Sequence, residues 1–206
     1  MEIAPLIGLS RHRLSTDGEG VTTLVAFHNC PLRCKYCLNP QSLQPEMIWK
    51  YYSCEQLYNE VKVDEIYFLA TNGGITFGGG EPGLRHKFIN EFRQLCGPDW
   101  QLVVETSLNI PRKNMKALLP IIDNYIVDIK DMNDAIYKKY TDKSNKNTID
   151  NLQYLIDNGK VDQIIIRTPF IPSYNTEEDI DHSIALLKEM GLNQFDRFIY
   201  RTLIDK

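Results

Sequence analysis

Short apolar runs rich in β-branched and aromatic residues alternate along this chain with stretches of helical periodicity. Several of these runs are continuously apolar, which is typical of strands in a parallel sheet covered on one or both faces. The predicted strands cover residues 21–27, 74–78, 101–106, 124–129, 163–168 and 196–201. The predicted helices cover residues 54–63, 86–96, 112–119, 132–140, 147–158 and 177–190. This alternation predicts an α/β fold, an open, partial (β/α)6 barrel with outer helices around a parallel sheet.

The composition is that of one globular domain. Residues 1–206 contain no linker, repeat or low-complexity segment, so we expect a single domain. A net charge of −4 leaves no basic surplus for a phosphate backbone, so nucleic acid is not an expected partner. No apolar run approaches the roughly 20 residues of a membrane span, and the N-terminus lacks the pattern of a secretory signal. We therefore expect a cytoplasmic protein whose thiols stay reduced.

Three of the five cysteines, Cys30, Cys34 and Cys37, form a C-x3-C-x2-C motif in one short loop. An odd number of cysteines with this clustering favours a thiolate metal site over a disulfide framework. Three thiolates so close together can bind three corners of a [4Fe–4S] cluster, which normally takes four cysteines. If no fourth cysteine reaches the loop, one iron is left for a small molecule.

Two other interpretations of the loop stay open at this point. A zinc site would take a fourth ligand, and His28 is close enough to be considered, although zinc usually prefers paired C-x2-C units. Alternatively, the thiols have no metal. Cys54 and Cys96 fall on predicted helices away from the loop, where they resemble small buried hydrophobic residues.

Polar or glycine-rich motifs follow five of the predicted strands. In chain order they are the cysteine loop, GGGEP at residues 78–82, Glu105-Thr106, Asp128-Ile129-Lys130 and Arg167-Thr168-Pro169. Side chains at the carboxyl ends of parallel strands converge on one face of the sheet, where ligands bind. We therefore expect these motifs to build one shared site.

Together these motifs resemble those of a known superfamily. The cysteine motif has an aromatic residue, Tyr36, before its last cysteine, and Gly-Gly-Glu-Pro follows at residues 79–82. This pair of motifs resembles the radical S-adenosylmethionine (SAM) superfamily. The segments STDGEGV at 15–21 and NGGITFGGGEP at 72–82 are similar to glycyl radical enzyme activating enzymes. DIKDMND at 128–134 resembles the DLKxMND segment of pyruvate formate-lyase activating enzyme.

The resemblance implies that Cys30, Cys34 and Cys37 bind three irons of a [4Fe–4S] cluster, and that the amino and carboxylate groups of SAM chelate the fourth. It implies further SAM-binding residues: Tyr36 and Leu38 at the adenine, Gly79, Gly80 and Glu81 along the methionine, Asp128 and Lys130 at the ribose and carboxylate end, and Arg167 as either a ligand contact or a charge at the barrel rim.

A monovalent cation is also implied by the resemblance. Its ligands would be the carboxylates of Glu105 and Asp128, the SAM carboxylate, and backbone carbonyls near Thr106 and Val127. Glu105 stands where pyruvate formate-lyase activating enzyme has Asp. The longer side chain either shifts the ion or leaves Lys130 to neutralise the charge of the two carboxylates.

The implied activity is reductive cleavage of SAM to methionine and a 5′-deoxyadenosyl radical, which abstracts hydrogen from a glycine of a partner glycyl radical enzyme. Flavodoxin or ferredoxin is the implied electron donor. Cys54 is the only cysteine in residues 38–70, so the cysteine-rich insert of many activating enzymes is missing. We therefore expect one cluster. Typical relatives place a His-bearing segment over the adenosine, where this chain has Arg201 and Thr202.

Three other functions remain as alternatives to this expectation. One is a small radical SAM enzyme acting on a free metabolite, similar to 7-carboxy-7-deazaguanine synthase. Another is an anaerobic ribonucleotide reductase activase. The third is a non-catalytic zinc or iron–sulfur binding module.

Overall fold

The computed structural model describes residues 2–14 and 17–199. The chain divides into two compact units. The first comprises Met1–Cys30, Asn39–Thr106 and Lys113–Ile126, and the second comprises Pro31–Leu38, Ser107–Arg112 and Val127–Lys206.

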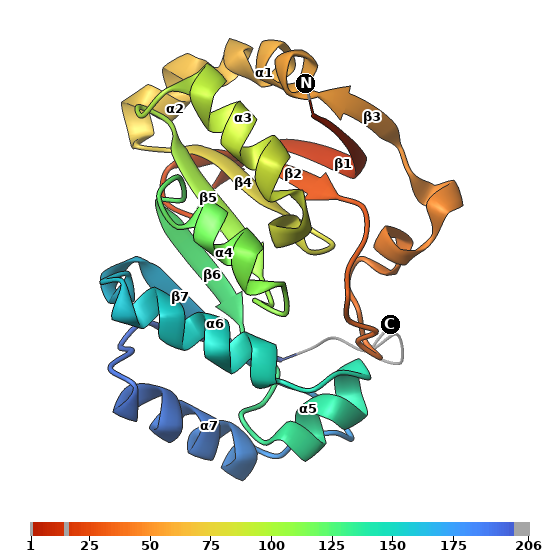
Figure 1. Ribbon diagram of the computed structural model, residues 1–206, viewed down its shortest axis with the longest axis vertical. Coiled ribbons are helices and arrows are strands. Elements are labelled where there is room, and N and C mark those ends of the chain that lie inside the picture. Colours follow the sequence, from red (N-terminus) through yellow and green to blue (C-terminus); the bar gives the residue numbers. More distant parts are fainter. Residues whose placement is uncertain (1, 15–16, 200–206) are drawn as a thin grey trace. The chain divides into compact units, whose positions relative to one another are not determined.

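The sheet of the first unit combines an antiparallel edge with parallel inner strands (Figure 1). Its strands are β1 (Ile3–Leu14), β2 (Val21–Phe27), β3 (Lys50–Ser53), β4 (Gly74–Gly79) and β5 (Gln101–Thr106), in the order β3-β1-β2-β4-β5. Strand β1 runs antiparallel to both β2 and β3, whereas β2, β4 and β5 are parallel to one another. Strand β6 (Asn124–Asp128) begins in this unit beside β5.

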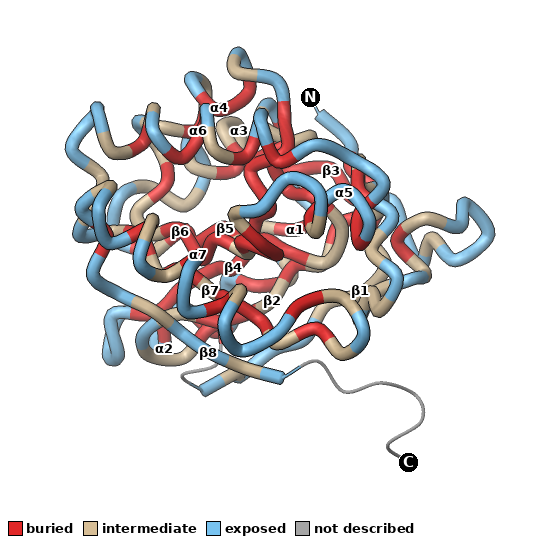
Figure 2. Tube along the Cα trace, turned by 90° about the horizontal axis from the view of Figure 1, so that it is seen from below, coloured by how far each residue is buried: buried red, intermediate tan, exposed pale blue. Residues whose placement is uncertain are grey.

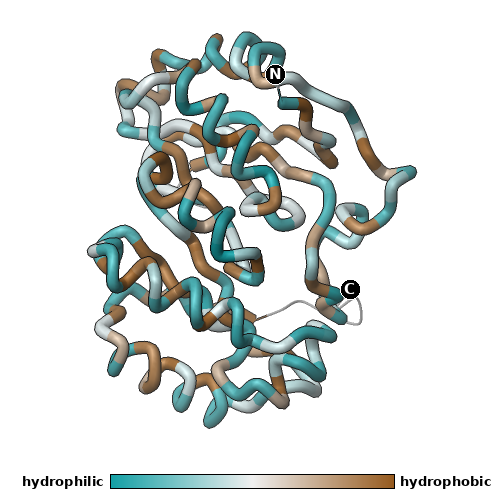
Figure 3. The backbone as a smooth tube through the Cα atoms, viewed as in Figure 1, coloured by the Kyte–Doolittle hydropathy of each residue, from teal (hydrophilic) through white to brown (hydrophobic). Residues whose placement is uncertain are grey.

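Four α-helices lie between strands β3 and β6 in chain order. They are α1 (Cys54–Val61), α2 (Glu65–Thr71), α3 (His86–Cys96) and α4 (Arg112–Leu118). Helix α3 buries a stripe that includes Phe88 and Phe92, as expected from its helical spacing of apolar residues. The Phe92 ring packs edge-on against Phe77 of β4 with centroids 5.6 Å apart, and Phe77 stacks on Phe27 of β2 at 5.6 Å. Inner strands β4 and β5 are buried along most of their length (Figure 2), in agreement with their apolar sequence (Figure 3).

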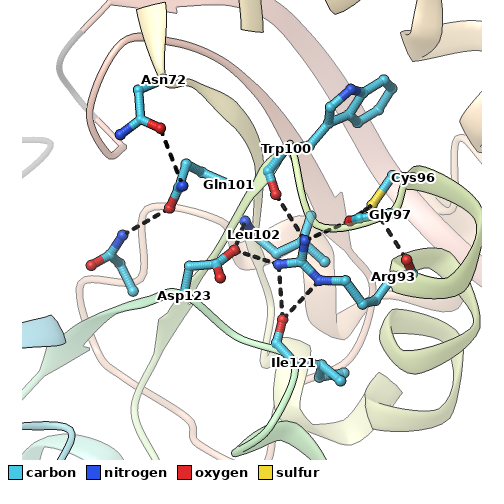
Figure 4. A network of polar contacts seen from close by, with 10 residues as sticks. Asn72, Arg93, Cys96, Gly97, Trp100, Gln101, Leu102, Ile121 and Asp123 are labelled. Carbon is cyan, nitrogen blue, oxygen red and sulfur yellow. Dashed lines mark hydrogen bonds and ion pairs between the residues drawn. The ribbon is translucent and has the colours of Figure 1, made fainter. Parts of the chain in front are cut away.

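Arg93 of α3 ties the helix to the loops around β5 (Figure 4). Its guanidinium donates to the backbone carbonyls of Gly97 and Trp100, each at 2.8 Å, and twice to that of Ile121, at 3.0 and 3.1 Å. It also pairs with the carboxylate of Asp123, which accepts a hydrogen bond from the backbone N–H at the start of β5. One side chain thereby satisfies three backbone carbonyls that lie outside regular secondary structure.

The second unit contains the end of β6, strands β7 (Ile164–Phe170) and β8 (Phe195–Ile199), and helices α5 (Asp134–Thr141), α6 (Lys146–Asp157) and α7 (Glu177–Glu189). Strand β8 runs parallel to β7. Helix α7 begins with a capping box, in which the Thr176 hydroxyl accepts from the backbone N–H of Asp179 and the Asp179 carboxylate accepts from that of Thr176.

The structure confirms the α/β fold with a mostly parallel sheet, and each predicted strand and helix is present with small shifts at its ends. The predicted strand 196–201 corresponds to β8, which covers Phe195–Ile199, and residues 200 and 201 lie outside the described part. Among the strands and α-helices of the described residues, β1, β3 and α2 were not predicted. Within residues 2–14 and 17–199, none of the helices has the length and apolar character needed to cross a membrane.

Candidate active site

The cysteine loop of the second unit is fastened to the end of helix α5. The backbone N–H of Arg33 donates to the carbonyl of Thr141 at 2.9 Å, and that of Lys35 donates to the carbonyl of Tyr140 at 3.2 Å. A turn closes between Cys34 and Cys37, whose N–H donates to the Cys34 carbonyl at 3.3 Å. These bonds fix the backbone that carries two of the three predicted iron ligands, and they also use carbonyls at the end of the helix.

Cys34 lies among aromatic side chains. It packs against a buried pair formed by Tyr140 and Ile171, together with Tyr36 and Tyr174. Burial raises the pKa of the Cys34 thiol to about 11, and the nearby Lys130 ammonium opposes this rise. The thiol is therefore protonated at neutral pH in the metal-free chain, and binding of a metal there must release a proton.

Cys30 belongs to the first unit and lies three residues after the end of β2. The preceding residue, Asn29, has a φ of 85°, in the left-handed region that favours glycine. In the described part of the chain, no three His, Cys, Asp or Glu side chains gather as ligands of one metal ion. A [4Fe–4S] cluster makes no such demand, because each cysteine binds a different iron.

The glycines of the GGGEP motif allow close contact between chain segments of the first unit. The Gly80 N–H donates to the Phe27 carbonyl at 2.8 Å, and the Glu81 N–H donates to the Asn29 carbonyl at 2.8 Å. A Cβ on Gly80 would lie 2.2 Å from the Asn29 carbonyl oxygen. A glycine at this position therefore allows the motif to approach the residue before Cys30.

Glu81 uses its carboxylate within the protein. The side chain is only 1% exposed. Its Oε1 accepts from the Thr106 hydroxyl at 2.7 Å and from the Gly83 N–H at 3.0 Å. These contacts join the end of β5 to the loop after β4. No local sequence pattern predicts this contact of the Thr106 hydroxyl, because Glu81 lies 25 positions away.

Glu105 lies beside the first glycine of the motif. A Cβ on Gly78 would lie 2.9 Å from its Oε2, so this glycine leaves room for the carboxylate. Glu105 is half-buried on β5. Asn39 also reaches this loop, and its Nδ2 donates to the Gly79 carbonyl at 3.2 Å.

Asp128 and Lys130 of the second unit form a pair at the end of β6. Lys130 is 5% exposed, and its Nζ lies 2.9 Å from Asp128 Oδ2. It is therefore not a solvated surface lysine. The other carboxylate oxygen, Asp128 Oδ1, is buried and has no hydrogen-bond partner among the described residues. A buried acceptor without a donor fits a ligand hydroxyl or a cation.

The backbone after Lys130 is held by a buried carboxylate. Asp131 accepts a hydrogen bond from the Asn133 N–H at 2.8 Å and weaker ones from Asn175 Nδ2 and the Ser183 hydroxyl, both at 3.4 Å. Burial raises the pKa of Asp131, and the Asn133 N–H opposes this rise. Asp131 was not among the predicted site residues, and two of its three partners, Asn175 and Ser183, come from distant segments.

The remaining predicted residues lie as follows. Arg167 of β7 pairs with Asp196 of β8 at 3.2 Å, which is a direct cross-strand pair in the parallel register. Tyr36 is half-buried, whereas Leu38 is 66% exposed. Ser15, Thr16, Arg201 and Thr202, which were part of the resemblance or of the predicted adenine region, lie outside the described residues.

Known proteins resemble this chain over most of its length. The Radical SAM superfamily matches residues 24–193. The (2S)-3-sulfopropanediol dehydratase activating enzyme of Klebsiella oxytoca is 35% identical over 85% of this chain and 74% of its own. The pyruvate formate-lyase 1-activating enzyme of Escherichia coli (strain K12) is 27% identical over 86% of this chain and 72% of its own.

Solved structures agree on the fold. The crystal structure of Streptococcus suis SuiB bound to precursor peptide SuiA has a TM-score of 0.66 at 15% identity, over 86% of this chain and 38% of that chain. Native anSMEcpe with bound AdoMet has a TM-score of 0.55 at 17% identity, over 84% of this chain and 49% of that chain. The chain therefore belongs to the radical SAM superfamily and, within it, to the activating enzymes of glycyl radical enzymes.

Proposed function

We propose that Cys30, Cys34 and Cys37 hold a single [4Fe–4S] cluster and that SAM binds at the iron without a cysteine. The donor set supports this, because the three thiols have the required spacing and Cys54 and Cys96 belong to helices of the first unit. When bound, the cluster supplies the electron for reductive cleavage of SAM, and the protein supplies binding, orientation and exclusion of water.

The observation that carries the SAM site is the pair Asp128 and Lys130. A buried ammonium suits the SAM carboxylate, and the unpartnered Asp128 Oδ1 suits a ribose hydroxyl. We assign further contacts to Tyr36, Leu38, Gly79, Gly80, Glu81 and Arg167. Among these, Glu81 acts through the loop that it holds, since its carboxylate already bonds Thr106 and Gly83.

The proposed macromolecular partner is a glycyl radical enzyme, whose glycine gives up the hydrogen atom. Two relatives activate a (2S)-3-sulfopropanediol dehydratase and a pyruvate formate-lyase, as their names state. The proposed electron donor is a flavodoxin or ferredoxin, and the proposed compartment is the cytoplasm, where the thiols stay reduced.

Anaerobic reconstitution with iron and sulfide tests the cluster. The wild-type protein should turn brown, and its reduced form should give an EPR signal that changes when SAM is added. Cys34→Ala should lose the signal, because the loop has no fourth cysteine that could replace it. Cys96→Ala, at a half-buried cysteine on α3, is the matched control and should keep the signal.

Product analysis tests the reaction itself. With dithionite alone, the loaded protein should slowly form 5′-deoxyadenosine and methionine from SAM. A colourless, zinc-loaded, folded protein would contradict the cluster. Fast multiple turnover on a small heterocycle would instead favour the metabolite-directed alternative.

A monovalent cation at Glu105 and Asp128 is part of the proposal. SAM cleavage should then depend on potassium or sodium, because hard oxygen ligands suit such an ion. Glu105→Gln should weaken that dependence by removing one charge. The measurement compares cleavage rates in potassium buffer and in a bulky organic-cation buffer. Equal rates in both buffers, for wild type and variant alike, would remove the cation and leave the cluster untouched.

A further inference from the structure

Basic residues gather around the cysteine loop of the second unit although the chain as a whole is acidic. The segments 33–35 and 134–146 contain six basic and two acidic residues, which leaves the rest of the chain at −8 against a total of −4. All six basic residues are exposed: Arg33, Lys35, Lys138, Lys139, Lys143 and Lys146. We call these six residues the basic face. Such local charge asymmetry attracts partners of opposite sign.

The basic face borders Cys34 directly. The hydrogen bonds from Arg33 and Lys35 to the end of α5 bring the loop beside the helix that carries Lys138 and Lys139. The Lys139 ammonium lies 5.5 Å from the centre of the Tyr174 ring.

Tyr174 lies between Lys139 and the buried Tyr140. Its ring lies 5.1 Å from that of Tyr140, and Cys34 packs against Tyr140. A continuous packed path therefore leads from a surface lysine to a predicted iron ligand, all within one unit.

Local stability explains only part of this arrangement. Lys138 and Lys139 lie in the last turn of α5, where cations interact favourably with the helix dipole. Lys35 pairs with Asp142 at 3.0 Å, and Lys146 with Asp150 at 2.9 Å. Lys143 is exposed and takes part in neither the helix end nor these two pairs, yet it adds a further positive charge beside α5.

We propose that the basic face is the docking surface for an acidic one-electron carrier protein of the flavodoxin kind, which reduces the cluster. This rests on the proposed function. One electron leaves the reduced flavin, which goes from hydroquinone to semiquinone, and the cluster goes from the 2+ to the 1+ state. Electron-transfer complexes are small and short-lived, so charge complementarity close to the acceptor steers them.

Binding measured without electron transfer tests the surface directly. The probe is an acidic flavodoxin in its oxidised state, titrated with the cluster-loaded protein at several salt concentrations. The double variant Lys138→Glu/Lys139→Glu should raise the Kd about tenfold or more at low ionic strength, and the difference should shrink as salt screens the charges.

The matched control is Lys113→Glu/Lys116→Glu, which reverses two exposed charges on α4 in the first unit and should leave the Kd within about twofold. Lys138→Gln/Lys139→Gln removes the charges without adding acidic groups at the helix end. It should raise the Kd by a smaller factor and serves if the Glu variant folds poorly.

Electron transfer separates the docking surface from the proposed function. SAM cleavage with a photoreduced small-molecule donor should be equal in wild type and Lys138→Glu/Lys139→Glu. Stopped-flow reduction by flavodoxin hydroquinone should be slower in the variant. An unchanged Kd would overturn the docking surface even if SAM is cleaved. A variant with normal flavodoxin binding and weakened binding of a glycyl radical enzyme would overturn it too, by assigning the face to that enzyme.

Discussion

Asp64 shows how one buried carboxylate joins distant residues. Its side chain is 2% exposed. It accepts two hydrogen bonds from the Arg11 guanidinium, both at 2.6 Å, and lies 2.9 Å from His12 Nε2. These contacts secure the irregular end of β1, where His12 has a φ of 56°. A strained backbone of this kind persists only where its surroundings fix it.

Replacing Asp64 should reveal a pH-dependent contribution to stability. The Arg11 hydrogen bonds lower the pKa of Asp64 from its ordinary 3.8, despite opposing desolvation, and His12 adds to the shift. A lowered folded-state pKa stabilises the protein above about pH 4, and this contribution is lost as the pH falls through the folded value. Asp64→Asn should therefore lower the free energy of unfolding by about 1–3 kcal/mol at neutral pH. The loss stays in this range because Arg11 is part-exposed, so that water screens part of the interaction.

Urea unfolding at neutral and acidic pH measures this effect. The difference between wild type and Asp64→Asn should narrow as the pH falls below about 4. Asp99→Asn, at an exposed position, is the control and should stay within about 0.5 kcal/mol. A difference that does not change with pH would contradict the ionised pair.

Gly80 offers a test of the contact between the glycine motif and the residue before Cys30. Gly80→Ala would place a methyl group 2.2 Å from the Asn29 carbonyl oxygen, so the loop must move. We expect a loss of about 1–3 kcal/mol of unfolding free energy and weaker SAM binding by the loaded enzyme. Gly8→Ala is the control, because a Cβ there meets nothing within 4 Å. Equal effects of the two substitutions would show that the contact is unimportant.

At the level of single residues, the sequence reveals ligands more readily than the contacts that support them. The spacing of Cys30, Cys34 and Cys37 is visible in one loop. The hydrogen bond between Thr106 and Glu81 spans 25 positions, and the one between Ser183 and Asp131 spans 52. Such pairs depend on the finished fold, so no local pattern predicts them.

Single elements were predictable where their pattern was regular. The inner strands and helix α3 have continuous or helically spaced apolar residues, and their predicted bounds agree closely with the structure. Strand β1 contains Pro5, Gly8 and two register irregularities, which break any strand pattern. Strand β3 has only four residues. Helix α2 buries only Phe68 and exposes apolar neighbours, so it lacks the amphipathic pattern of a helix.

Arg93 connects secondary-structure elements, because its guanidinium holds α3 to the segments before β5 and β6. Arg93→Lys keeps the charge but loses the planar fork, and it leaves backbone carbonyls without donors. We expect a loss of about 2–4 kcal/mol in the free energy of unfolding by urea. Gln94→Ala, at an exposed position on the same helix, should change it by about 0.5 kcal/mol or less. Similar values for both variants would contradict the role of Arg93.

For the chain as a whole, the alternation of strands and helices was sufficient to predict the mostly parallel α/β fold. It was not sufficient to predict how the chain divides into compact units. The cysteine loop leaves the first unit after Cys30 and the chain returns at Asn39, so the division cuts across a single motif. Contacts between residues far apart in the sequence determine such a division, and periodicity contains no information about them.

The expectation of a single domain can be tested by the cooperativity of unfolding. Strand β6 belongs to the first unit at Asn124–Ile126 and continues into the second at Val127–Asp128. Because its central residues are buried, unfolding of either unit exposes apolar side chains of this strand. We therefore expect one two-state transition in urea.

Trp49 and Trp100 both lie in the first unit, so tryptophan fluorescence reports on that unit, whereas far-ultraviolet circular dichroism reports on both. The two curves should coincide in midpoint and slope. If the dichroism curve shows two transitions and the fluorescence curve follows only one of them, the units unfold separately. The chain would then be better described as two domains.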